Sequence, residues 1–360
     1  SQTQRYVDLH RPDNTPDILQ YIEHGPLNLL AQAEIIGHMA QTLSNSVLDN
    51  YHHLGDAASI TDGLTYNPNL GPYEVAKDGR SSGVKDDMWA FTNRNPSLDL
   101  RAATTFAAAS RALKGYNDDL SARTLVQSQR LLREATELLA KQRQDTSRWA
   151  KLGNIGTNLQ LYIATGEKEY LKNFDESLWT ELDRSLTLTI STALNAVPHL
   201  DASYKEKLKP YIIKYKDYIL SLEKENPYGV PIELRNWAGS NAVTSFGTTV
   251  CFAHKYYPDI IDASHALKAS NFLFGTHPYH NYSLVATVGA SRPKEVFYGN
   301  NRADFSFIPG NVAPGVLFRK PDHFENYDDW PFLWGQNEGT IAGNTNYLIF
   351  GLALKILIKQ

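Results

Sequence analysis

The sequence contains a single cysteine, Cys251, which lies in the apolar stretch TTVCFAHKYY. One thiol excludes a disulfide framework and a thiolate metal cluster, and a cysteine in such a setting is usually a small buried hydrophobe. The eleven histidines include no His-x-x-x-His on a predicted helix and no His/Cys pair at zinc spacing. We therefore predict no metal site and no cofactor, although calcium held by Asp and carbonyl oxygens remains compatible with the loops.

Other absences narrow the function further. The 35 basic residues do not exceed the 39 acidic ones, so we expect no nucleic-acid partner. No uninterrupted run approaches the ~18 apolar residues of a membrane span, and the opening SQTQRYVDLHRPDN has no signal-peptide pattern. We therefore expect a soluble chain without a membrane span. Gly-x-Ser-x-Gly and Gly-Lys-Ser/Thr are missing as well, which disfavours serine-triad and nucleotide chemistry.

Helical patterns are what the sequence has in abundance. Thr15, Pro16 and Asp17 suit the N-cap, N1 and first turn of a helix that Gly25-Pro26 should kink or split, and the segment 165–171 is typical of a turn between two helices. We predict further helices over about 98–114 (ended by Gly115), 118–141, 147–164, 177–195, 203–222, 240–256, 259–274 and 338–357.

The sequence shows no series of alternating strands, so these patterns predict an all-α toroid rather than a small bundle. The predicted helices are fewer than a closed double layer of six helical hairpins requires, which predicts that some are missing.

Two irregular regions, 51–97 and 275–336, interrupt the helices. Loops this long are usually functional, so we interpret them as walls of a cleft. The chain has 20 Tyr, 14 Phe and 6 Trp, and aromatic rings suit a cleft that stacks on sugars as well as a large core. The candidates for stacking, each equally explained as a core residue, are Tyr66, Trp89, Phe91, Trp237 and Trp334.

Adjacent aspartates occur twice in these regions, at Asp86-Asp87 and Asp328-Asp329. Paired carboxylates are compatible with catalysis or metal binding, but adjacent Asp residues in loops mostly serve as solvated caps and turns. We predict the latter.

The strongest local signal is the stretch DDWPFLWGQNEGTIAGNTNYLIFGLALK, in which Glu338 lies where an aromatic, glycine-rich loop becomes a helix. Rings at Trp330, Phe332 and Trp334 would raise the pKa of this carboxyl, as a general acid requires. A helix N-terminus would lower the pKa, so the net direction stays open. The alternative is that Glu338 is an ordinary first-turn helix acid.

The run QNEGTIAGNTNYLIFGLAL resembles the C-terminal signature of glycoside hydrolase family 9, in which an Asn-Glu pair precedes a helix and the Glu is the catalytic acid. The segment 272–293 resembles the Gly-x-Asn-Pro region of that family, with His277 in place of the Asn. NWAGSN at 236–241 and the segment 14–37 are similar to two further family segments. The resemblance covers nearly the whole chain in the family's order.

This resemblance implies an (α/α)6 barrel and hydrolysis of β-1,4-glucosidic bonds with inversion, with Glu338 as the general acid. The family's base is an Asp in an Asp-Ala-Gly-Asp motif before the helix at 14–37, and the sequence contains no such motif. The closest string, at 54–63, resembles a later segment of the family. We therefore interpret 1–360 as a catalytic domain that lacks its N-terminal helices and its base; a non-catalytic glycan-binding relative is the alternative.

The family's His-His-Arg, which binds sugar at the cleavage point, corresponds here to Asn300-Asn301-Arg302. Arg302 can keep its fork of donors, while the two Asn residues change the hydrogen-bonding pattern; a structural role for Arg302 is the alternative. This change favours, as a second hypothesis, an exo-acting glycosidase on a modified sugar such as glucosamine. A polysaccharide lyase using Tyr282 and His280 is a weaker option.

We expect the partner to be a β-glucan polysaccharide or oligosaccharide, together with the missing N-terminal segment. The location expected for such an enzyme is secreted or periplasmic.

Overall fold

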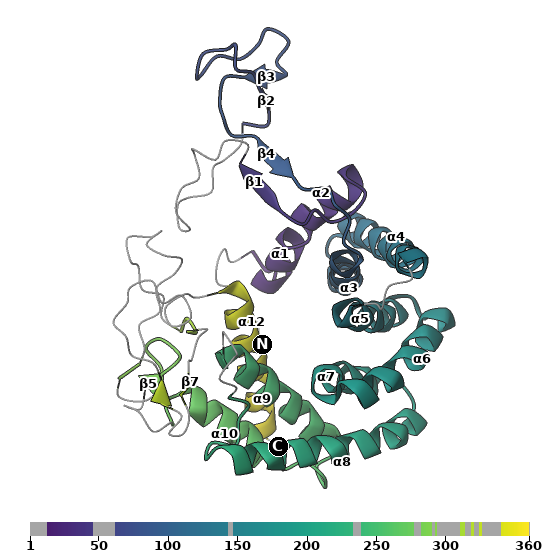
Figure 1. The fold of residues 1–360 in the computed structure, drawn as a ribbon, viewed down its shortest axis with the longest axis vertical. Helices are drawn as coiled ribbons and strands as arrows, with labels where there is room; N and C mark the ends of the chain where they lie inside the picture. Colours follow the sequence, from purple (N-terminus) through teal and green to yellow (C-terminus); the bar gives the residue numbers. More distant parts are fainter. Residues whose placement is uncertain are drawn as a thin grey trace. The chain divides into compact units, whose positions relative to one another are not determined.

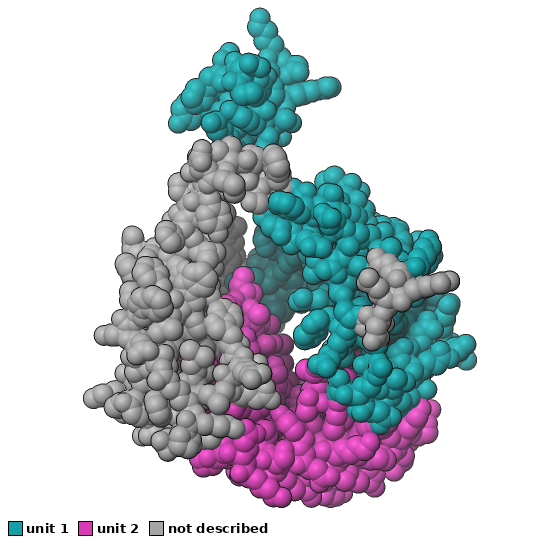
Figure 2. All heavy atoms as spheres, in the orientation of Figure 1, with its two compact units in different colours: residues 1–50, 60–185 teal, residues 51–59, 186–360 magenta. Residues whose placement is uncertain are grey.

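The computed structural model describes residues 13–45, 62–142, 147–232, 239–276, 282–289, 292–293, 310–313, 318–319, 324–325 and 340–359 (Figure 1). The chain divides into two compact units (Figure 2). Unit 1 holds residues 1–50 and 60–185, and unit 2 holds residues 51–59 and 186–360.

Unit 1 consists of helices and a few short strands. Its elements are α1 (Asp17–His24), α2 (Leu27–Ile35), β1 (Leu43–Asn45), β2 (Thr65–Tyr66), β3 (Ser81–Ser82), β4 (Met88–Ala90), α3 (Pro96–Leu113), α4 (Asp118–Gln142), α5 (Arg148–Thr165) and α6 (Lys168–Arg184). Strand β1 pairs antiparallel with β4, and β2 pairs parallel with β3.

Local sequence explains several of these helix ends. The Asn95 side chain accepts a hydrogen bond from the backbone N–H of Ser97, with Pro96 in the first turn of α3, an arrangement that both residues favour. Ser147 caps α5 in the same way by accepting from Ala150. Gly166 ends α5 with φ 76°, a left-handed conformation that glycine adopts at little cost.

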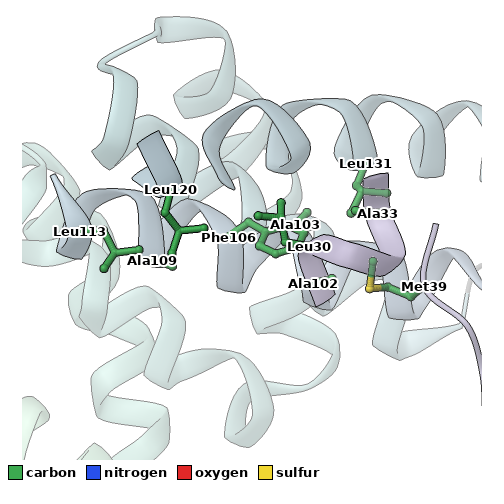
Figure 3. Close-up of a cluster of buried hydrophobic side chains, with 10 residues drawn as sticks. All are labelled: Leu30, Ala33, Met39, Ala102, Ala103, Phe106, Ala109, Leu113, Leu120 and Leu131. Carbon is green, nitrogen blue, oxygen red and sulfur yellow. The ribbon is translucent and has the colours of Figure 1, made fainter. Parts of the chain in front are cut away.

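One hydrophobic core cluster of unit 1 lies between α2, α3 and α4, and a second lies between α3, α4 and α5. Figure 3 shows Phe106 of α3 among small and branched side chains from these helices. The buried cluster comprises Leu30, Ala33, Met39, Ala102, Ala103, Phe106, Ala109, Leu113, Leu120 and Leu131. The alanines let the helices approach closely, so the cluster fixes how these three helices pack.

A buried carboxylate fixes the chain between α2 and α3. Asp99 is fully buried, and it accepts hydrogen bonds from the backbone N–H of Met39 and from Arg94, each over 2.9 Å. Arg94 also bonds Glu134 on α4, and Arg130 bonds the same carboxylate. A buried charge with every partner in place holds three elements in one arrangement.

Unit 2 is again mainly helical. Its elements are α7 (Leu186–Ala196), the 3-10 turn η3 (Val197–His199), α8 (Ala202–Glu225), α9 (Gly239–Tyr256), α10 (Ser264–Leu273), β5 (Tyr282–Ser283), β6 (Arg292–Pro293), β7 (Phe318–Arg319), β8 (Phe324–Glu325) and α12 (Ile341–Ile358).

Three helix predictions are wrong in detail. The predicted helix 177–195 is two helices, because Ser185 leaves the helical region with φ −148° and ψ 60° between α6 and α7. Thr15 is not the N-cap of α1: Pro16 takes that position with ψ 128° and makes no side-chain cap. Helix α10 begins at Ser264 rather than near 259, since turns occupy the residues after Pro258. The predicted break at Gly25-Pro26 is confirmed, because α1 and α2 are separate helices.

Helix α12 is unusually apolar for an exposed helix. Its 18 residues have a mean hydropathy of 1.4, and only 17% of this window is buried. By length and composition alone this helix could cross a membrane, which the search for uninterrupted apolar runs did not show because Gly, Asn and Thr are interspersed in it. The prediction of a chain without a membrane span stays a prediction. The core helix of a soluble protein meets the same criterion, so the finding is weak evidence for a membrane.

Candidate functional site

Two helices of unit 2, α9 and α12, run side by side in the same direction. Near their starts, a Cβ placed on Gly343 would lie 3.3 Å from Oδ1 of Asn241. About two turns later, a Cβ on Gly247 would collide with the ring of Phe350. Because the two contacts occur in the same order along both helices, the N-termini of α9 and α12 lie together.

A buried two-stranded ladder lies beside these helix starts. The segment 283–286 faces 310–313, with Val285 and Val312 forming an antiparallel bridge. The backbone N–H of Ala286 donates to Asn311 O over 2.9 Å, and the N–H of Ala313 donates to Leu284 O over 2.8 Å. All of these residues except the half-buried Gly310 are buried, so the ladder satisfies its own backbone groups away from water.

Side chains attach the ladder to both helices. Asn344, in the first turns of α12, accepts from the backbone N–H of Val312 over 2.9 Å and donates to Asn311 Oδ1 over 2.6 Å. Ser240, at the start of α9, donates to the backbone carbonyl of Ala313 over 2.6 Å. The ladder is thus held between two helix N-termini by three polar side chains.

Glu338 lies two residues before the N-cap of α12, outside the described residues. The N-cap is Thr340, whose hydroxyl accepts from the backbone N–H of Gly343 over 3.0 Å. Consecutive Cα atoms are 3.8 Å apart, so the Cα of Glu338 cannot lie more than ~7.6 Å from that of Thr340. The chain therefore tethers the predicted acid to the scaffold formed by α9, α12 and the ladder.

The other predicted site residues of unit 2 also lie outside the described residues: His277, Trp237, Asn300, Asn301, Arg302 and Trp334. Two of them are adjacent in sequence to described segments at the start of α9 and after the end of α10. Trp237 is two residues before Gly239, where α9 begins, and His277 follows Thr276, just after α10. Of the two residues named for a lyase, Tyr282 lies in β5 and His280 is outside the described residues.

Two buried polar atoms of this scaffold have no hydrogen-bond partner among the described residues: Oδ1 of Asn241 and Nδ2 of Asn311. A buried polar atom without a partner costs stability, so such atoms often mark functional positions. Neither residue was predicted as a site residue, and nor were Ser240 and Asn344. Three of these four residues, Ser240, Asn241 and Asn344, lie in the strings NWAGSN and NEGTIAGN that carry the family resemblance. The sequence therefore pointed to these segments, but it could not show which of their side chains meet.

Tyr66 and Trp89 belong to the short strands of unit 1. The backbone N–H of Tyr66 donates to Asp87 Oδ2 over 2.7 Å, and Lys85 Nζ lies 5.9 Å from the centre of the Tyr66 ring. The ring is partly buried and so keeps some exposed surface. Trp89 lies opposite Ser44 in the β1–β4 pair.

The prediction of solvated aspartates fails for Asp86, which is 5% exposed. Asp86 accepts from the backbone N–H of Asp62 over 2.5 Å, while its other oxygen has no partner in the part of the chain that the structure describes. Asp86 therefore joins the backbone at Asp62 to the segment just before β4. It does not cap a turn in contact with solvent. Asp328 and Asp329 lie outside the described residues.

Burial shifts the pKa of one titratable side chain on α12 and of one on α9. Burial raises the pKa of Tyr347, whose ring packs edge-on against Phe274 with centroids 6.3 Å apart. Burial also raises the pKa of the Cys251 thiol to about 12, and this cysteine is buried as predicted. Among the described residues no group of three or more His, Cys, Asp and Glu could hold a metal ion.

Comparisons with known proteins agree on one family. The model of glycosyl hydrolase family 9 matches residues 76–350. A GH9 structure from Bacteroides ovatus superposes with a TM-score of 0.68 and 17% identity over 98% of this chain and 66% of that one. A metagenome-derived family 9 endoglucanase gives 0.66 and 18% over 98% and 65%. An endoglucanase from the termite Nasutitermes takasagoensis gives 0.55 and 15% over 76% and 68%.

No curated protein matches the chain. The chain spans less than two thirds of the length of the first two solved structures. The likeness confirms the predicted all-α fold of the (α/α)6 class. Since the family model matches well over half of the sequence, the chain belongs to glycosyl hydrolase family 9.

Proposed function

We propose that this chain carries the acid half of an inverting glycoside hydrolase that cleaves β-1,4-glucosidic bonds, with Glu338 as the general acid. The observation that supports this best is the anchoring of the α12 N-terminus. Thr340 caps the helix and Asn344 bonds it to the buried ladder. In this chain of family 9, Glu338 precedes that cap by two residues. A catalytic acid must be held rigidly so that its carboxyl group stays at the right distance from the bond that it protonates.

In the proposed reaction, Glu338 protonates the leaving oxygen while a second carboxylate activates a water on the opposite side of the sugar. Inversion requires the two carboxyl groups to be about 6.5–9.5 Å apart, which leaves room for that water. We place the base on an Asp outside these 360 residues. Arg302 would donate its fork of hydrogen bonds to sugar hydroxyls.

Two of the solved structures are endoglucanases, and this supports a cellulose-like or mixed-linkage β-glucan as substrate. The rings of Tyr66, Trp89, Trp237 and Trp334 are the proposed stacking surfaces, and Asn300, Asn301 and His277 would set the hydrogen bonds around them. Because such polymers are met outside the cytoplasm, we propose a secreted or periplasmic location.

The proposed partner of this chain is a helical segment that covers α12 and brings the base. Along α12, Ile341, Leu348, Leu352 and Ile356 are each more than half exposed. An apolar stripe of this size is typical of a contact surface. Two hollows, of about 360 and 230 Å³, border the helix on the α10 and α9 sides and can receive side chains of an amphipathic helix.

The test of the function is hydrolysis of carboxymethyl cellulose and mixed-linkage glucan by the product of the complete reading frame, followed by reducing ends. Glu338→Gln keeps the shape but cannot donate the proton, so kcat should fall ~100- to 10,000-fold. Glu206→Gln, an exposed acid on α8, is the matched control. Full activity in the Glu338 variant would refute its assignment as the acid.

The same assay separates the alternatives. Anomeric NMR of the first product should show the α-anomer if the reaction inverts. Activity confined to glucosamine-containing oligosaccharides would favour the exo-acting glycosidase that Asn300 and Asn301 suggest. An unsaturated uronide, seen by ultraviolet absorbance, would indicate a lyase. Glycan binding without turnover would identify a non-catalytic relative.

The proposed covering segment is tested separately by placing charged residues on the exposed apolar stripe of α12. Leu348→Glu and Leu352→Glu should destabilise the product of the complete reading frame and leave the unfolding of the isolated 360-residue chain almost unchanged. Lys209→Glu, at an exposed position of α8, is the control. Equal effects in both proteins would show that the stripe is not covered.

A further inference from the structure

Gly343 lies in the first turn of α12, where this helix starts beside α9. It is buried, and a Cβ placed on it would lie 3.0 Å from the Thr340 hydroxyl and 3.3 Å from Asn241 Oδ1. Both distances are shorter than ordinary van der Waals contact. Glycine is among the poorest helix formers, so lack of space for a side chain, and not helix propensity, explains the glycine in this turn.

The Asn241 side chain brings a buried acceptor to the same place. Its Oδ1 has no hydrogen-bond partner among the described residues. A buried polar atom without a partner costs stability, so its presence calls for an explanation. Because this oxygen has almost no accessible surface, the group that completes it must belong to the chain itself and not to a dissolved ligand.

The Thr340 hydroxyl can supply that group. It accepts from the backbone N–H of Gly343 over 3.0 Å, and no described residue accepts its hydrogen. Both oxygens lie within 3.3 Å of one point beside Gly343, so a rotation of the Asn241 side chain can bring them within hydrogen-bonding distance. An amide both donates and accepts, so it can bond the hydroxyl in either orientation.

The start of α12 is contacted from two directions. Asn344 joins one side of the helix to the buried ladder through the backbone N–H of Val312. Gly343 presents a different side to Asn241 on α9, because successive residues of an α-helix are about 100° apart around its axis. Two contacts on different sides restrict both the shift and the rotation of the capped helix end.

We propose that Asn241 and Gly343 are positioning residues for the general acid. Asn241 holds the cap hydroxyl of Thr340, and Gly343 leaves the space that this contact needs. The cap lies two residues after Glu338, so a shift of the cap moves the carboxyl group relative to the leaving oxygen, and a displacement of about 1 Å can cost ~100-fold in rate. This inference rests on the proposed function of Glu338.

The experiment compares two substrates of the product of the complete reading frame. Mixed-linkage glucan requires protonation of its leaving oxygen, whereas 2,4-dinitrophenyl β-cellobioside releases a stable phenolate that needs no acid. Loss of acid catalysis therefore lowers kcat on the glucan far more than on the aryl glycoside. The ratio of the two activities is measured in one sample, so it does not depend on the fraction of folded protein.

Asn241→Leu keeps the volume and removes the amide, while Gly343→Ala adds the Cβ. Each should lower kcat on the glucan by ~10-fold or more with KM nearly unchanged, and kcat on the aryl glycoside by less than ~3-fold. Asn241→Asp keeps an acceptor oxygen beside a helix N-terminus, where a negative charge is stabilised, and should retain most of the activity. Ser245→Ala, exposed one turn further along α9, is the matched control.

The hydrogen bond itself is tested by combining changes. Adding Asn241→Leu to Thr340→Val should cause no further loss, because the hydroxyl is already absent; an undiminished further loss would overturn the proposal. Equal losses on both substrates in Asn241→Leu and Gly343→Ala, or full activity in both, would overturn it while Glu338→Gln stays selective for the glucan. Equal losses on both substrates in Glu338→Gln would instead refute the proposed function.

Discussion

The side chain of Asn344 donates to Oδ1 of Asn311 over 2.6 Å, while its own Oδ1 accepts from the backbone N–H of Val312. One side chain thus joins the first turns of α12 to a loop more than thirty residues earlier. The predicted acid is two residues from the cap of this helix, so the bond connects the scaffold to the proposed chemistry.

Asn344→Leu tests this connection. The change removes one partner each from the buried N–H of Val312 and from Oδ1 of Asn311, which keep their mutual hydrogen bond of 3.0 Å, so the free energy of unfolding should fall by about 1 kcal/mol. Hydrolytic activity should fall as well, because the α12 N-terminus loses its support. Urea unfolding and the reducing-end assay measure the two effects. Thr345→Ala, exposed in the same turn, should change stability by less than ~0.5 kcal/mol; an equal loss there would argue against the bridge.

Gly247→Ala should destabilise the packing of α9 on α12. A Cβ at this position would collide with the Phe350 ring, and overpacking of this kind costs about 1–3 kcal/mol. The double variant Gly247→Ala with Phe350→Leu should recover part of the loss. Gly351→Ala has open space around its Cβ and should stabilise α12 by up to ~1 kcal/mol through helix propensity. Thermal unfolding of all three variants checks the contrast.

Stability should decrease in acid partly through Glu134. Burial alone would raise the pKa of this carboxyl, but hydrogen bonds from Arg94 and Arg130 outweigh it, and the pKa is lowered from 4.5. The folded state therefore binds fewer protons than the unfolded state, so the contribution is present above pH 4.5 and is lost as the pH falls through the lowered value. The side chain is 30% exposed, which limits the effect to under ~1 kcal/mol.

Urea midpoints measured across this acidic range should therefore fall less steeply in Glu134→Gln than in the wild type. Glu137→Gln, an exposed acid on the same helix, should keep the wild-type slope. Identical slopes in all three proteins would show that Glu134 does not contribute to the loss of stability in acid.

Cys251 should be unreactive in the folded protein. It is 4% exposed, and burial raises its thiol pKa to about 12, so only about one molecule in 10⁴ carries the nucleophilic thiolate at pH 8. A chromogenic disulfide reagent should label it only after denaturation. Ser245→Cys, at an exposed position of the same helix, should add one thiol that reacts at once. Rapid labelling of the wild type would show that α9 opens locally.

Helix caps and periodicity made most of the helices predictable. Pro96 in the first turn of α3 and Gly166 after α5 act on the local backbone alone. The sequence therefore indicates the start of α3 and the end of α5 without knowledge of the tertiary structure. The break at Ser185 could not be predicted, because serine interrupts a helix only where the surroundings permit it.

The candidate site divides in the same way. Glu338 was found through a motif that is contiguous in sequence, whereas Ser240, Asn311 and Asn344 become a unit only when the chain brings residues from three segments together. Asp86 was misjudged as a solvated turn residue because its burial depends on strands that pair elsewhere in the chain.

The sequence by itself therefore determined the helical class, the family and the position of the predicted acid, since each is encoded in local propensity or in an ordered set of short motifs. Only the tertiary structure decided that α9 and α12 start side by side, and that Ser240 and Asn344 join these helices to a buried ladder. These features depend on contacts between residues distant in the chain, and the energy of such contacts is set by packing and burial, which no local pattern specifies.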